Sequence, residues 1–326
     1  MNTLSVFFPQ ALQPHFSKLL RSALLDGITI HEGSMPEEGY DILVEGEPSA
    51  AMVASNPRLQ SVVIPYAGIP ETTRTLLLQF PAIQVYNLHH NATAVAEYTL
   101  ALLLAAVKQI IPLHNALIRG DWSLRYYPSS SGMLHGGHVL ILGYGAIGRA
   151  VAHLLEPFGV SISAIRKNTS SVEKEGSVQV HPLGDLPALL PQTDFLIVTL
   201  PLTPETRGLI STAEFALLPN RAILVNVGRG DVVDQHALYA ALRSKRIAGA
   251  AIDVWYNYPE HLDDRSHTLP ADEPFQELDN IIMSPHKAGG LAVDEVERER
   301  MLALADLLNA IKQNTPPPAI DLHAGY

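Results

Sequence analysis

The chain has 326 residues, which suggests two domains, and carries a formal charge of −11 from 22 Lys and Arg against 33 Asp and Glu. It is 47% hydrophobic and only 17% charged, so global disorder is excluded. The acidic balance argues against a nucleic-acid partner or an anionic-membrane surface. The absence of cysteine excludes disulfides, thiolate nucleophiles and Cys-based metal sites.

Other special environments also lack a signal. The 14 histidines follow no metal-ligand spacing, so we expect no metal site. The longest strongly apolar stretch, residues 98–107, is about half the ~20 residues that a membrane span requires. The N-terminal residues show neither a basic segment nor a cleavage site of small residues. We therefore expect a cytoplasmic protein without membrane contact.

The first ninety residues alternate short apolar runs with amphipathic stretches. Because strands that alternate with helices form parallel βαβ units, this pattern predicts an α/β domain. The expected helices cover residues 15–25 and 71–80. The expected strands cover residues 4–8, 27–30, 41–46, 61–65 and 83–88.

A long helix is expected next, over residues 93–118. Apolar residues surround most of its circumference, which is typical of a helix buried between two bodies, although a core helix within one domain fits equally well. Residues 119–134 are polar and aromatic, contain Pro and Ser, and predict a loop.

A second alternation follows this loop, with helices between the early strands and a last helix over residues 292–312. The chain thus reads as two α/β halves of unequal size. The expected strands of the second half cover residues 139–143, 161–165, 195–200, 222–227, 248–253 and 280–285.

The sequence Gly143-Tyr144-Gly145-Ala146-Ile147-Gly148 is a G-x-G-x-x-G motif. It directly follows an expected strand and opens an expected helix, which is the context that makes this common pattern meaningful. Its glycines permit a tight turn, a close approach to a pyrophosphate and tight helix–strand packing. The helix N-terminus offers free N–H groups to an anion. The motif therefore predicts dinucleotide binding.

The end of the next strand indicates which dinucleotide binds. NAD-binding folds have Asp or Glu there for the adenosine ribose, but this chain has Arg166 and Lys167. A guanidinium can hold a phosphate with two hydrogen bonds. NADP is favoured over NAD, although an ordinary solvated basic loop would look the same.

Three further polar residues follow buried strands of the second half. They are Arg229 in an N-V-G-R-G segment, Asp253 in A-I-D-V-W, and His286 after Pro285. Each alone is commonly a surface or paired residue. Together they end strands of one sheet, at the edge where α/β folds bind ligands.

In this order and spacing, the motifs resemble the D-isomer-specific 2-hydroxyacid dehydrogenases. The resemblance rests on N-A-T-A-V-A-E (91–97), the glycine motif, L-P-L-T-P-E-T (200–206), N-V-G-R-G (226–230), Asp253-Val and Pro285-His286. It implies two Rossmann-like or flavodoxin-like doubly wound parallel-sheet domains with a cleft between them. Residues 1–92 plus 292–326 would form the substrate domain and residues 93–291 the dinucleotide-binding domain. The resemblance also implies a homodimer.

The same resemblance assigns roles to individual residues. His286 would be the acid/base, Arg229 would anchor the substrate, and the backbone of Ala67 and Gly68 would hold the other side of its carboxylate. Asp253 would hold the nicotinamide carboxamide. The full set of expected cofactor-binding residues is Gly143, Tyr144, Gly145, Ala146, Ile147, Arg166, Lys167, Leu200, Pro201, Thr206, Val227, Gly228, Arg229, Asp253 and His286.

The chain departs from the family at one catalytic position. The family usually has a Glu, followed by Pro, that pairs with the catalytic histidine, whereas this chain has Tyr258-Pro259. Formate dehydrogenases, which resemble the same family, carry a neutral Gln there. A carboxylate from the following acidic segment (Glu260, Asp272 or Glu273) could instead pair with His286.

These observations predict an NADP-preferring reductase that converts small 2-oxo acids, of the glyoxylate or hydroxypyruvate type, to D-2-hydroxy acids. His286 would donate the proton, with Arg229 and Tyr258 as the other catalytic residues. One alternative is a dehydrogenase of a small anion such as formate or phosphite, which the missing Glu suggests. Another is a non-catalytic nucleotide-sensing protein, against which the presence of both Arg229 and His286 speaks.

Overall fold

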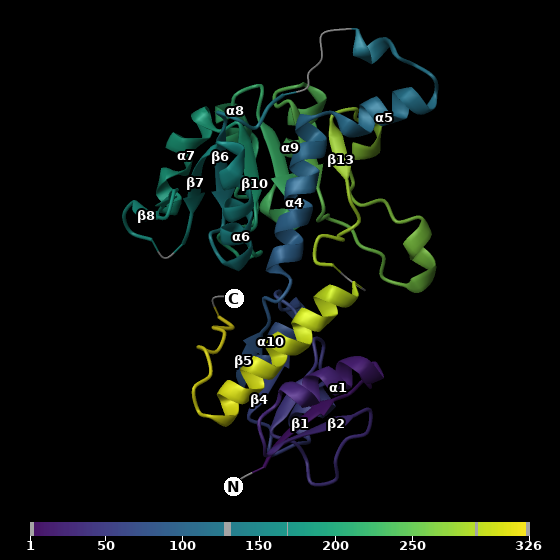
Figure 1. Ribbon diagram of the computed structural model, residues 1–326, viewed down its shortest axis with the longest axis vertical. Coiled ribbons are helices and arrows are strands. Elements are labelled where there is room, and N and C mark those ends of the chain that lie inside the picture. The colour runs from purple at the N-terminus through teal and green to yellow at the C-terminus, as the bar shows by residue number, and fades with distance from the viewer. Residues whose placement is uncertain (1–2, 127–131, 168, 291–292, 324–326) are drawn as a thin grey trace. The chain divides into compact units, whose positions relative to one another are not determined.

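The chain divides into two compact units in the computed structural model, which describes residues 3–126, 132–167, 169–290 and 293–323 (Figure 1). Unit 1 comprises residues 1–91 and 290–326, and unit 2 comprises residues 92–289. The first junction lies one residue from the expected boundary. The second expected boundary, between residues 291 and 292, falls outside the described residues.

Unit 1 is built on a five-stranded parallel sheet with the order β2-β1-β3-β4-β5, the flavodoxin-type order. Its strands are β1 (Leu4–Phe8), β2 (Ile28–Glu32), β3 (Ile42–Val44), β4 (Ser61–Ile64) and β5 (Gln84–Asn87). Its helices are α1 (Pro14–Ala23), α2 (Ala50–Ala54), α3 (Glu71–Leu77) and α10 (Asp294–Lys312).

Successive residues of a strand point to opposite faces of the sheet. Because both faces of this sheet carry apolar residues, helices cover both of them. Val6 and Phe8 of β1 pack with Leu304 and Leu308 of α10. Phe7, between them, belongs to a separate core that includes residues of α2 and α3. The last helix of the chain therefore completes the core of the first ninety residues.

Unit 2 is built on an eight-stranded sheet with the order β13-β12-β11-β10-β6-β7-β9-β8. All neighbours are parallel except β8 and β9. The chain winds outward from β6 in one direction and then, from β10, in the other. This is the doubly wound Rossmann pattern, and it confirms the expected fold class.

Both faces of this sheet are also apolar and covered. Leu140 and Leu142 of β6 face one core, and Val139 and Ile141 face the other. The strands are β6 (His138–Leu142), β7 (Ser161–Ile165), β8 (Glu173–Glu175), β9 (Val178–His181), β10 (Phe195–Val198), β11 (Ile223–Asn226), β12 (Gly249–Ile252) and β13 (Ile281–Met283). The helices are α4 (Ala92–Val107), α5 (Ile110–Ile118), α6 (Ala146–Leu155), α7 (Leu186–Leu189), α8 (Thr212–Leu217) and α9 (Gln235–Arg243).

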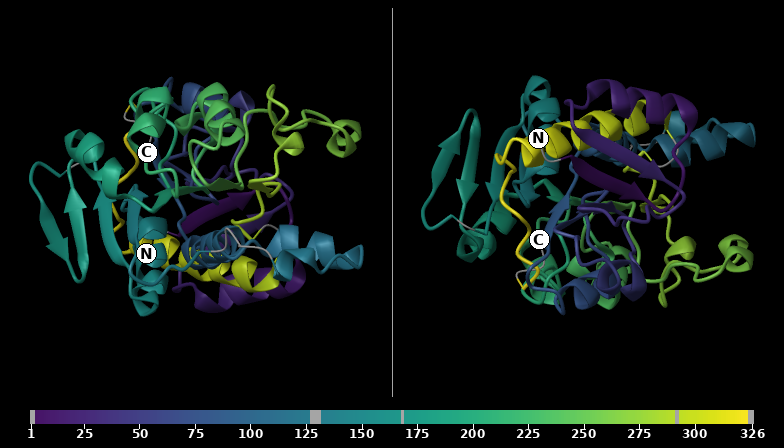
Figure 2. Two further views of the ribbon diagram at one scale, coloured as in Figure 1. Left: turned by 90° about the horizontal axis from the view of Figure 1, so that it is seen from above. Right: turned by 90° about the horizontal axis from the view of Figure 1, so that it is seen from below.

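The antiparallel hairpin of β8 and β9 was not expected from the sequence. Strand β8 is Glu-Lys-Glu and lies at the edge of the sheet (Figures 1 and 2). Its side chains are largely solvated. Such a strand lacks the apolar alternation by which strands are recognised. Strand β9 is only four residues long, and it extends the sheet beyond β7.

The expected single helix over residues 93–118 is wrong, since the structure breaks it into α4 and α5. Gln109 lies between them with a left-handed φ of 56°. Pro112 gives the physical reason, because within a continuous helix its ring would clash with the carbonyl of residue 108 and it could not donate a hydrogen bond. Among the described residues no single helix could cross a membrane; α4 and α5 together meet the length and composition criteria but are bent by 63°.

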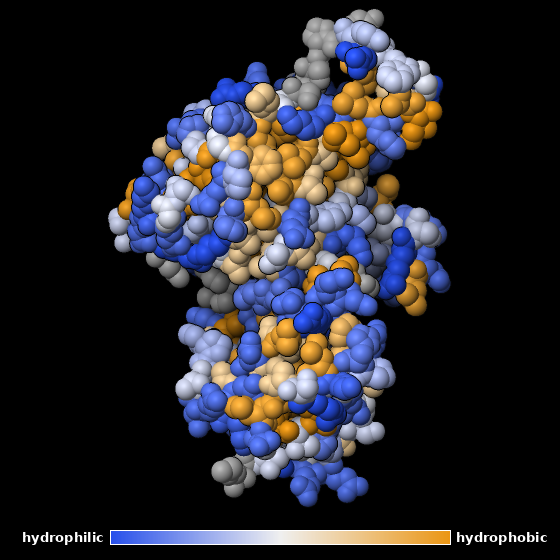
Figure 3. All heavy atoms as spheres, in the orientation of Figure 1, coloured by the Kyte–Doolittle hydropathy of each residue, from blue (hydrophilic) through white to orange (hydrophobic). Residues whose placement is uncertain are grey.

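Helix α5 and the residues after it expose large apolar side chains, which gather on one surface (Figure 3). We call this surface the α5 patch. It comprises Ile110, Ile111, Leu113, Leu117, Ile118, Trp122, Leu124, Tyr126 and Met133. Ile118 is 71% exposed and Tyr126 is 76% exposed, which is unusual for side chains of this size.

Candidate functional site

The expected site residues of unit 2 follow the carboxyl ends of six neighbouring parallel strands. Because parallel strands run in one direction, these ends share one edge of the sheet. In spatial order, Arg166 and Lys167 follow β7, the glycine motif follows β6, Leu200 and Pro201 follow β10, and Gly228 and Arg229 follow β11. Asp253 follows β12, and His286 follows β13.

The glycine motif has the geometry of a dinucleotide-binding turn. Gly143 has a φ of 101°, which L side chains rarely adopt. A Cβ on Gly148 would lie 2.1 Å from the Gly143 carbonyl oxygen, so only glycine allows helix α6 to pack this closely. A Cβ on Gly145 would meet open space, and no side chain caps the N-terminus of α6. The turn is therefore open where a pyrophosphate would lie, and a dinucleotide fits it.

The loop after β10 approaches this turn closely and also contacts the loop after β11. The Thr199 hydroxyl donates to the Gly143 carbonyl at 2.7 Å. A Cβ on Gly228 would lie 2.6 Å from the Leu200 carbonyl oxygen, so the loops after β10 and β11 meet backbone to backbone. Thr206 closes the loop after β10 by donating to the Pro201 carbonyl at 2.7 Å. Three loops expected to hold the cofactor thus lie together.

Arg166 has carboxylate partners that the sequence did not reveal. Its Nη2 donates to Glu173 at 2.5 Å, its Nη1 donates to Glu175, and its Nε donates to Thr169 at 3.0 Å. Both glutamates lie on β8, the strand that was not expected. Lys167 Nζ lies 3.9 Å from a carboxylate oxygen of Glu205. The expected phosphate-binding cations are therefore already paired.

Asp253 is fully buried and holds the segment that carries His286. Its Oδ1 accepts from the Ser284 hydroxyl at 2.5 Å and from the Lys287 N–H at 2.9 Å, and its Oδ2 accepts from the Ala288 N–H at 2.9 Å. A buried carboxylate needs such donors, since its desolvation is otherwise costly. The contact with a nicotinamide carboxamide stays a prediction.

The backbone of His286 is held in a strained conformation. Its φ is 54°, in the left-handed region, where a residue other than glycine costs about 1–3 kcal/mol. The two backbone hydrogen bonds to Asp253 follow it directly in the chain and hold this turn. The Ser284 hydroxyl is also 2.8 Å from the Tyr98 hydroxyl of α4, and the Ser284 carbonyl accepts from the Trp255 indole at 2.8 Å.

Tyr258 is the hydrogen-bond partner of His286. Its hydroxyl lies 3.0 Å from His286 Nδ1 and accepts from the Trp255 N–H at 3.1 Å. Two of the carboxylates considered as alternatives are occupied elsewhere. Glu273 pairs with His236 at 2.6 Å, and Asp272 accepts from Asn257 at 3.0 Å. The phenol therefore occupies the position beside His286, and its correspondence to the Glu that the family usually has stays a prediction.

Arg229 lies partly buried at the end of β11, with its Nη1 donating to the Gly228 carbonyl at 2.7 Å. The Asn226 side chain braces this turn, because it accepts from the Gly228 N–H and donates to the Arg229 carbonyl, both at 3.0 Å. The backbone of the arginine is thus fixed before any substrate binds.

Electrostatics at the site disfavour imidazolium. Reduced hydration and the charge of Arg229 lower the pKa of His286, and Asp253 opposes this shift. His286 remains solvent-accessible, so the effect reflects partial rather than full burial. Desolvation raises the pKa of Tyr258, which therefore stays a neutral phenol at neutral pH.

The expected substrate loop belongs to unit 1. Ala67 and Gly68 follow β4, and the Ala67 carbonyl accepts from the Asn87 side chain at 2.5 Å. The ring of Tyr66 lies over Gly46, where a Cβ would come within 2.0 Å of the phenol oxygen. This loop is held at the carboxyl edge of the unit 1 sheet.

Comparison with known proteins identifies this arrangement. Residues 100–288 match the family model "D-isomer specific 2-hydroxyacid dehydrogenase, NAD binding domain". The chain belongs to this family. Its second unit is accordingly a nicotinamide-dinucleotide-binding domain.

Individual relatives support the same assignment. A glyoxylate reductase of Korarchaeum cryptofilum is 35% identical over 231 residues, which cover 68% of this chain and 64% of that protein. A glyoxylate/hydroxypyruvate reductase B of Pectobacterium carotovorum is 34% identical over 235 residues, 69% of each chain. The chain spans just under two thirds of the length of the Korarchaeum relative.

The whole fold is shared with a solved member of the family. A D-isomer-specific 2-hydroxyacid dehydrogenase from Xanthobacter autotrophicus Py2, solved in complex with NADPH and MES, superposes with a TM-score of 0.79. It is 26% identical and covers 100% of both chains. The sequence had thus predicted the family and fold, whereas the roles of Glu173, Glu175 and Ser284 emerge only from the structure.

Proposed function

We propose that this protein is an NADP-preferring reductase that converts small 2-oxo acids, of the glyoxylate or hydroxypyruvate type, to D-2-hydroxy acids. The observation that carries the proposal is the common sheet edge of unit 2. Along this edge lie the dinucleotide-binding glycine turn, Arg229, whose backbone is held by Asn226, and His286, whose Nδ1 contacts Tyr258.

The cofactor would be held by the glycine turn and by the loops after β7, β10 and β11. When bound, the reduced nicotinamide supplies the hydride that reaches the ketone carbon. Asp253 and Val227, at the ends of β12 and β11, would face the nicotinamide end, and Arg166 and Lys167 the adenosine end. This division follows from the order of the strands along the edge.

His286 would supply the proton for the carbonyl oxygen of the substrate. Its Nδ1 faces Tyr258, which leaves Nε2 for the substrate. In the imidazolium both ring nitrogens carry protons, so Nδ1 donates to the phenol oxygen while Nε2 donates to the substrate. Proton donation leaves a neutral ring, and the phenol keeps it oriented.

Arg229 would bind the carboxylate of the 2-oxo acid and stabilise the negative charge that builds on the carbonyl oxygen. A guanidinium suits this task because it holds two oxygens at once and remains charged even when partly buried. The backbone of Ala67 and Gly68, in unit 1, would bind the other side of the same carboxylate. The substrate would accordingly be a small anion.

Two relatives support the preference for NADP, since the Xanthobacter structure holds NADPH and a Sinorhizobium meliloti neighbour is an NADPH-dependent glyoxylate/hydroxypyruvate reductase solved with NADP. In this chain the preference rests on Arg166 and Lys167. NAD remains possible, because both cations are paired with carboxylates. The cytoplasmic location expected from the sequence stays a prediction.

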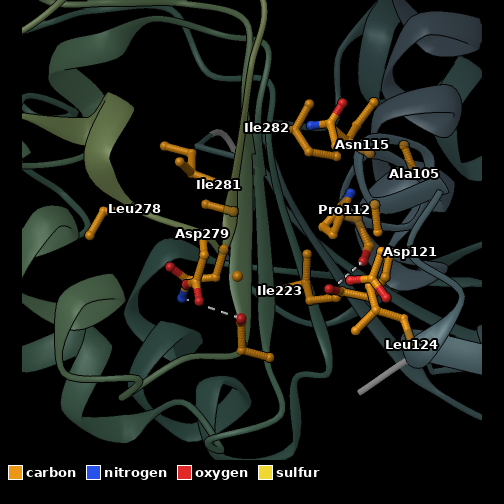
Figure 4. Close-up of a pocket in the computed structure, with 18 of the residues that line it drawn as sticks. Ala105, Pro112, Asn115, Asp121, Leu124, Ile223, Leu278, Asp279, Ile281 and Ile282 are labelled. Carbon is orange, nitrogen blue, oxygen red and sulfur yellow. Dashed lines mark hydrogen bonds between the residues drawn. The ribbon is translucent and has the colours of Figure 1, made fainter. Parts of the chain in front are cut away.

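The α5 patch supports a homodimer in which two copies bury it against each other. A cavity of about 480 Å³ lies beside α5, lined in part by Pro112, Leu124, Ile223 and Ile281 (Figure 4). It lies at the amino ends of β11 and β13, at the opposite edge of the sheet from His286. A second copy could therefore fill it without blocking the site.

A substrate panel tests the proposal as a whole. It compares glyoxylate, hydroxypyruvate, pyruvate and a bulkier 2-oxo acid with each reduced cofactor, and formate and phosphite with each oxidised one. We expect the highest kcat/KM for glyoxylate or hydroxypyruvate with NADPH. Turnover of formate or phosphite alone would favour the small-anion dehydrogenase, and no turnover at all would favour the nucleotide-sensing protein.

Replacing the two central residues should affect different steps. We expect His286→Ala to lower kcat by ~10²-fold or more, the usual range for a lost general acid, and to leave the Kd of NADPH nearly unchanged. Arg229→Ala should mainly raise KM for the 2-oxo acid. His153→Ala, an exposed histidine on α6, is the matched control. More than about a tenth of the activity in His286→Ala would contradict the assignment.

The cofactor preference is measured by kcat/KM with NADPH and with NADH. A charge-assisted phosphate contact contributes roughly 1.5–3 kcal/mol, so we expect a preference of about tenfold to a hundredfold for NADPH. Arg166→Asp should erase or invert it. Equal efficiency of the unmodified enzyme with both cofactors would contradict the preference.

Tyr258 should set the pH dependence of reduction. Imidazolium is present below the pKa of His286 and is lost above it, and this pKa lies below the ordinary 6.5. The efficiency of reduction should therefore decline at a lower pH than in relatives that have Glu. Tyr258→Glu should move the decline upward by about 1–3 pH units. Tyr258→Phe should lower the rate of reduction without moving the decline to a higher pH.

The control for this experiment is Glu260→Gln, which removes the nearest carboxylate in sequence. We expect its pH profile of kcat/KM to match that of the unmodified enzyme. A downward shift in Glu260→Gln, with no change in Tyr258→Phe, would show that the carboxylate partner has moved along the loop.

The dimer is tested by sedimentation velocity at micromolar concentration. Ile118→Asp places a charge in the α5 patch and should convert dimers to monomers. Leu262→Asp, at an equally exposed leucine outside the patch (72%), should leave the dimer intact. A monomeric unmodified protein would refute the homodimer.

A further inference from the structure

Strand β8 places two carboxylates on the arginine that would recognise the 2′-phosphate of NADP. Glu173 and Glu175 each accept from one terminal nitrogen of Arg166. They lie on the same strand, two residues apart, so both side chains point to the same face of the sheet. Arg166 is thereby held in one position between them.

The two glutamates differ in how firmly they are held. Glu175 also accepts two hydrogen bonds from Arg149, at 3.1 and 3.3 Å, and Arg149 lies over the ring of Tyr144, 5.0 Å from its centroid. These hydrogen bonds lower the pKa of Glu175. Within the described part of the chain, Glu173 forms an ion pair only with Arg166, and its side chain is 46% exposed. Glu173 is therefore the partner that can be released.

The pairing changes the charge that a phosphate would meet. The sequence predicts an excess of positive charge after β7, but Arg166, Lys167 and Arg149 are matched by Glu173, Glu175 and Glu205. A phosphate that approached Arg166 would lie near both β8 carboxylates. Such like charges repel each other unless one of the carboxylates moves away.

We propose that Glu173 competes with the 2′-phosphate of NADP for Arg166 and so limits the preference of the enzyme for NADPH. This inference rests on the proposed cofactor site. When NADPH binds, the carboxylate of Glu173 leaves Nη2 of Arg166 and moves into solvent, and the 2′-phosphate replaces it as the partner of Nη2. Glu175 and Arg149 keep the guanidinium oriented. NADH has no such phosphate, so Glu173 does not oppose its binding.

The test is the equilibrium binding of NADPH and of NADH to the intact protein without substrate, measured by isothermal titration calorimetry. We expect Glu173→Gln to lower the Kd of NADPH by about threefold to tenfold and to change that of NADH by less than twofold. Asp279→Asn, which removes an exposed carboxylate paired with Lys245 at the other edge of the sheet, should change neither. Thermal melting of each variant verifies that it is folded.

A double variant separates this inference from the cofactor site itself. In the background of Arg166→Ala, Glu173→Gln should no longer strengthen NADPH binding, because the competition acts through the guanidinium. If Arg166→Ala binds NADPH as tightly as the unmodified protein, the proposed cofactor site is wrong. If Arg166→Ala weakens NADPH binding but Glu173→Gln leaves it unchanged, only the competition is refuted.

Discussion

The buried carboxylate of Asp253 is the constraint on which the geometry of the site depends. A charge without solvent access is destabilising by several kcal/mol unless donors surround it. Here the donors come from Ser284, Lys287 and Ala288, on both sides of His286. The compensation of one charge therefore also fixes the strained backbone of the histidine. The same segment is tied to α4 through the hydroxyl of Tyr98.

Tyr258 positions the ring of His286 without placing a full charge next to it. A carboxylate next to His286 would stabilise imidazolium, whereas the phenol of Tyr258 orients the ring and leaves its charge uncompensated. Arg229, the proposed anchor of the substrate, disfavours imidazolium further. An anionic substrate would offset this effect by neutralising Arg229. In the proposed mechanism, substrate binding and protonation of His286 are thus coupled through the guanidinium of Arg229.

At the β7 end of the sheet edge, in contrast to the surroundings of His286, the positive charge is already paired with carboxylates in the absence of a ligand. Arg166 is held between Glu173 and Glu175, and Glu175 connects it to Arg149 beside the glycine motif. Pairing keeps the arginine ordered at the cost of competition with a phosphate. The two ends of the proposed cofactor site therefore differ in how much of their charge is available to a ligand.

The sequence by itself determined the fold class, the glycine turn and the strand ends that carry Arg229, Asp253 and His286. These features depend on local patterns, since a few neighbouring residues suffice to recognise an apolar strand or a glycine-rich turn. The position of Tyr258 could likewise be inferred from the neighbouring Asp253-Val and Pro259.

Tertiary structure alone decided the partners of these residues. Strand β8 consists of charged residues without an apolar period, so nothing local predicts that Glu173 and Glu175 reach Arg166. The donors to Asp253 lie more than thirty positions away and include backbone N–H groups, which every residue has. Such contacts arise from the order of the strands in the sheet. Side-chain identity alone does not specify them.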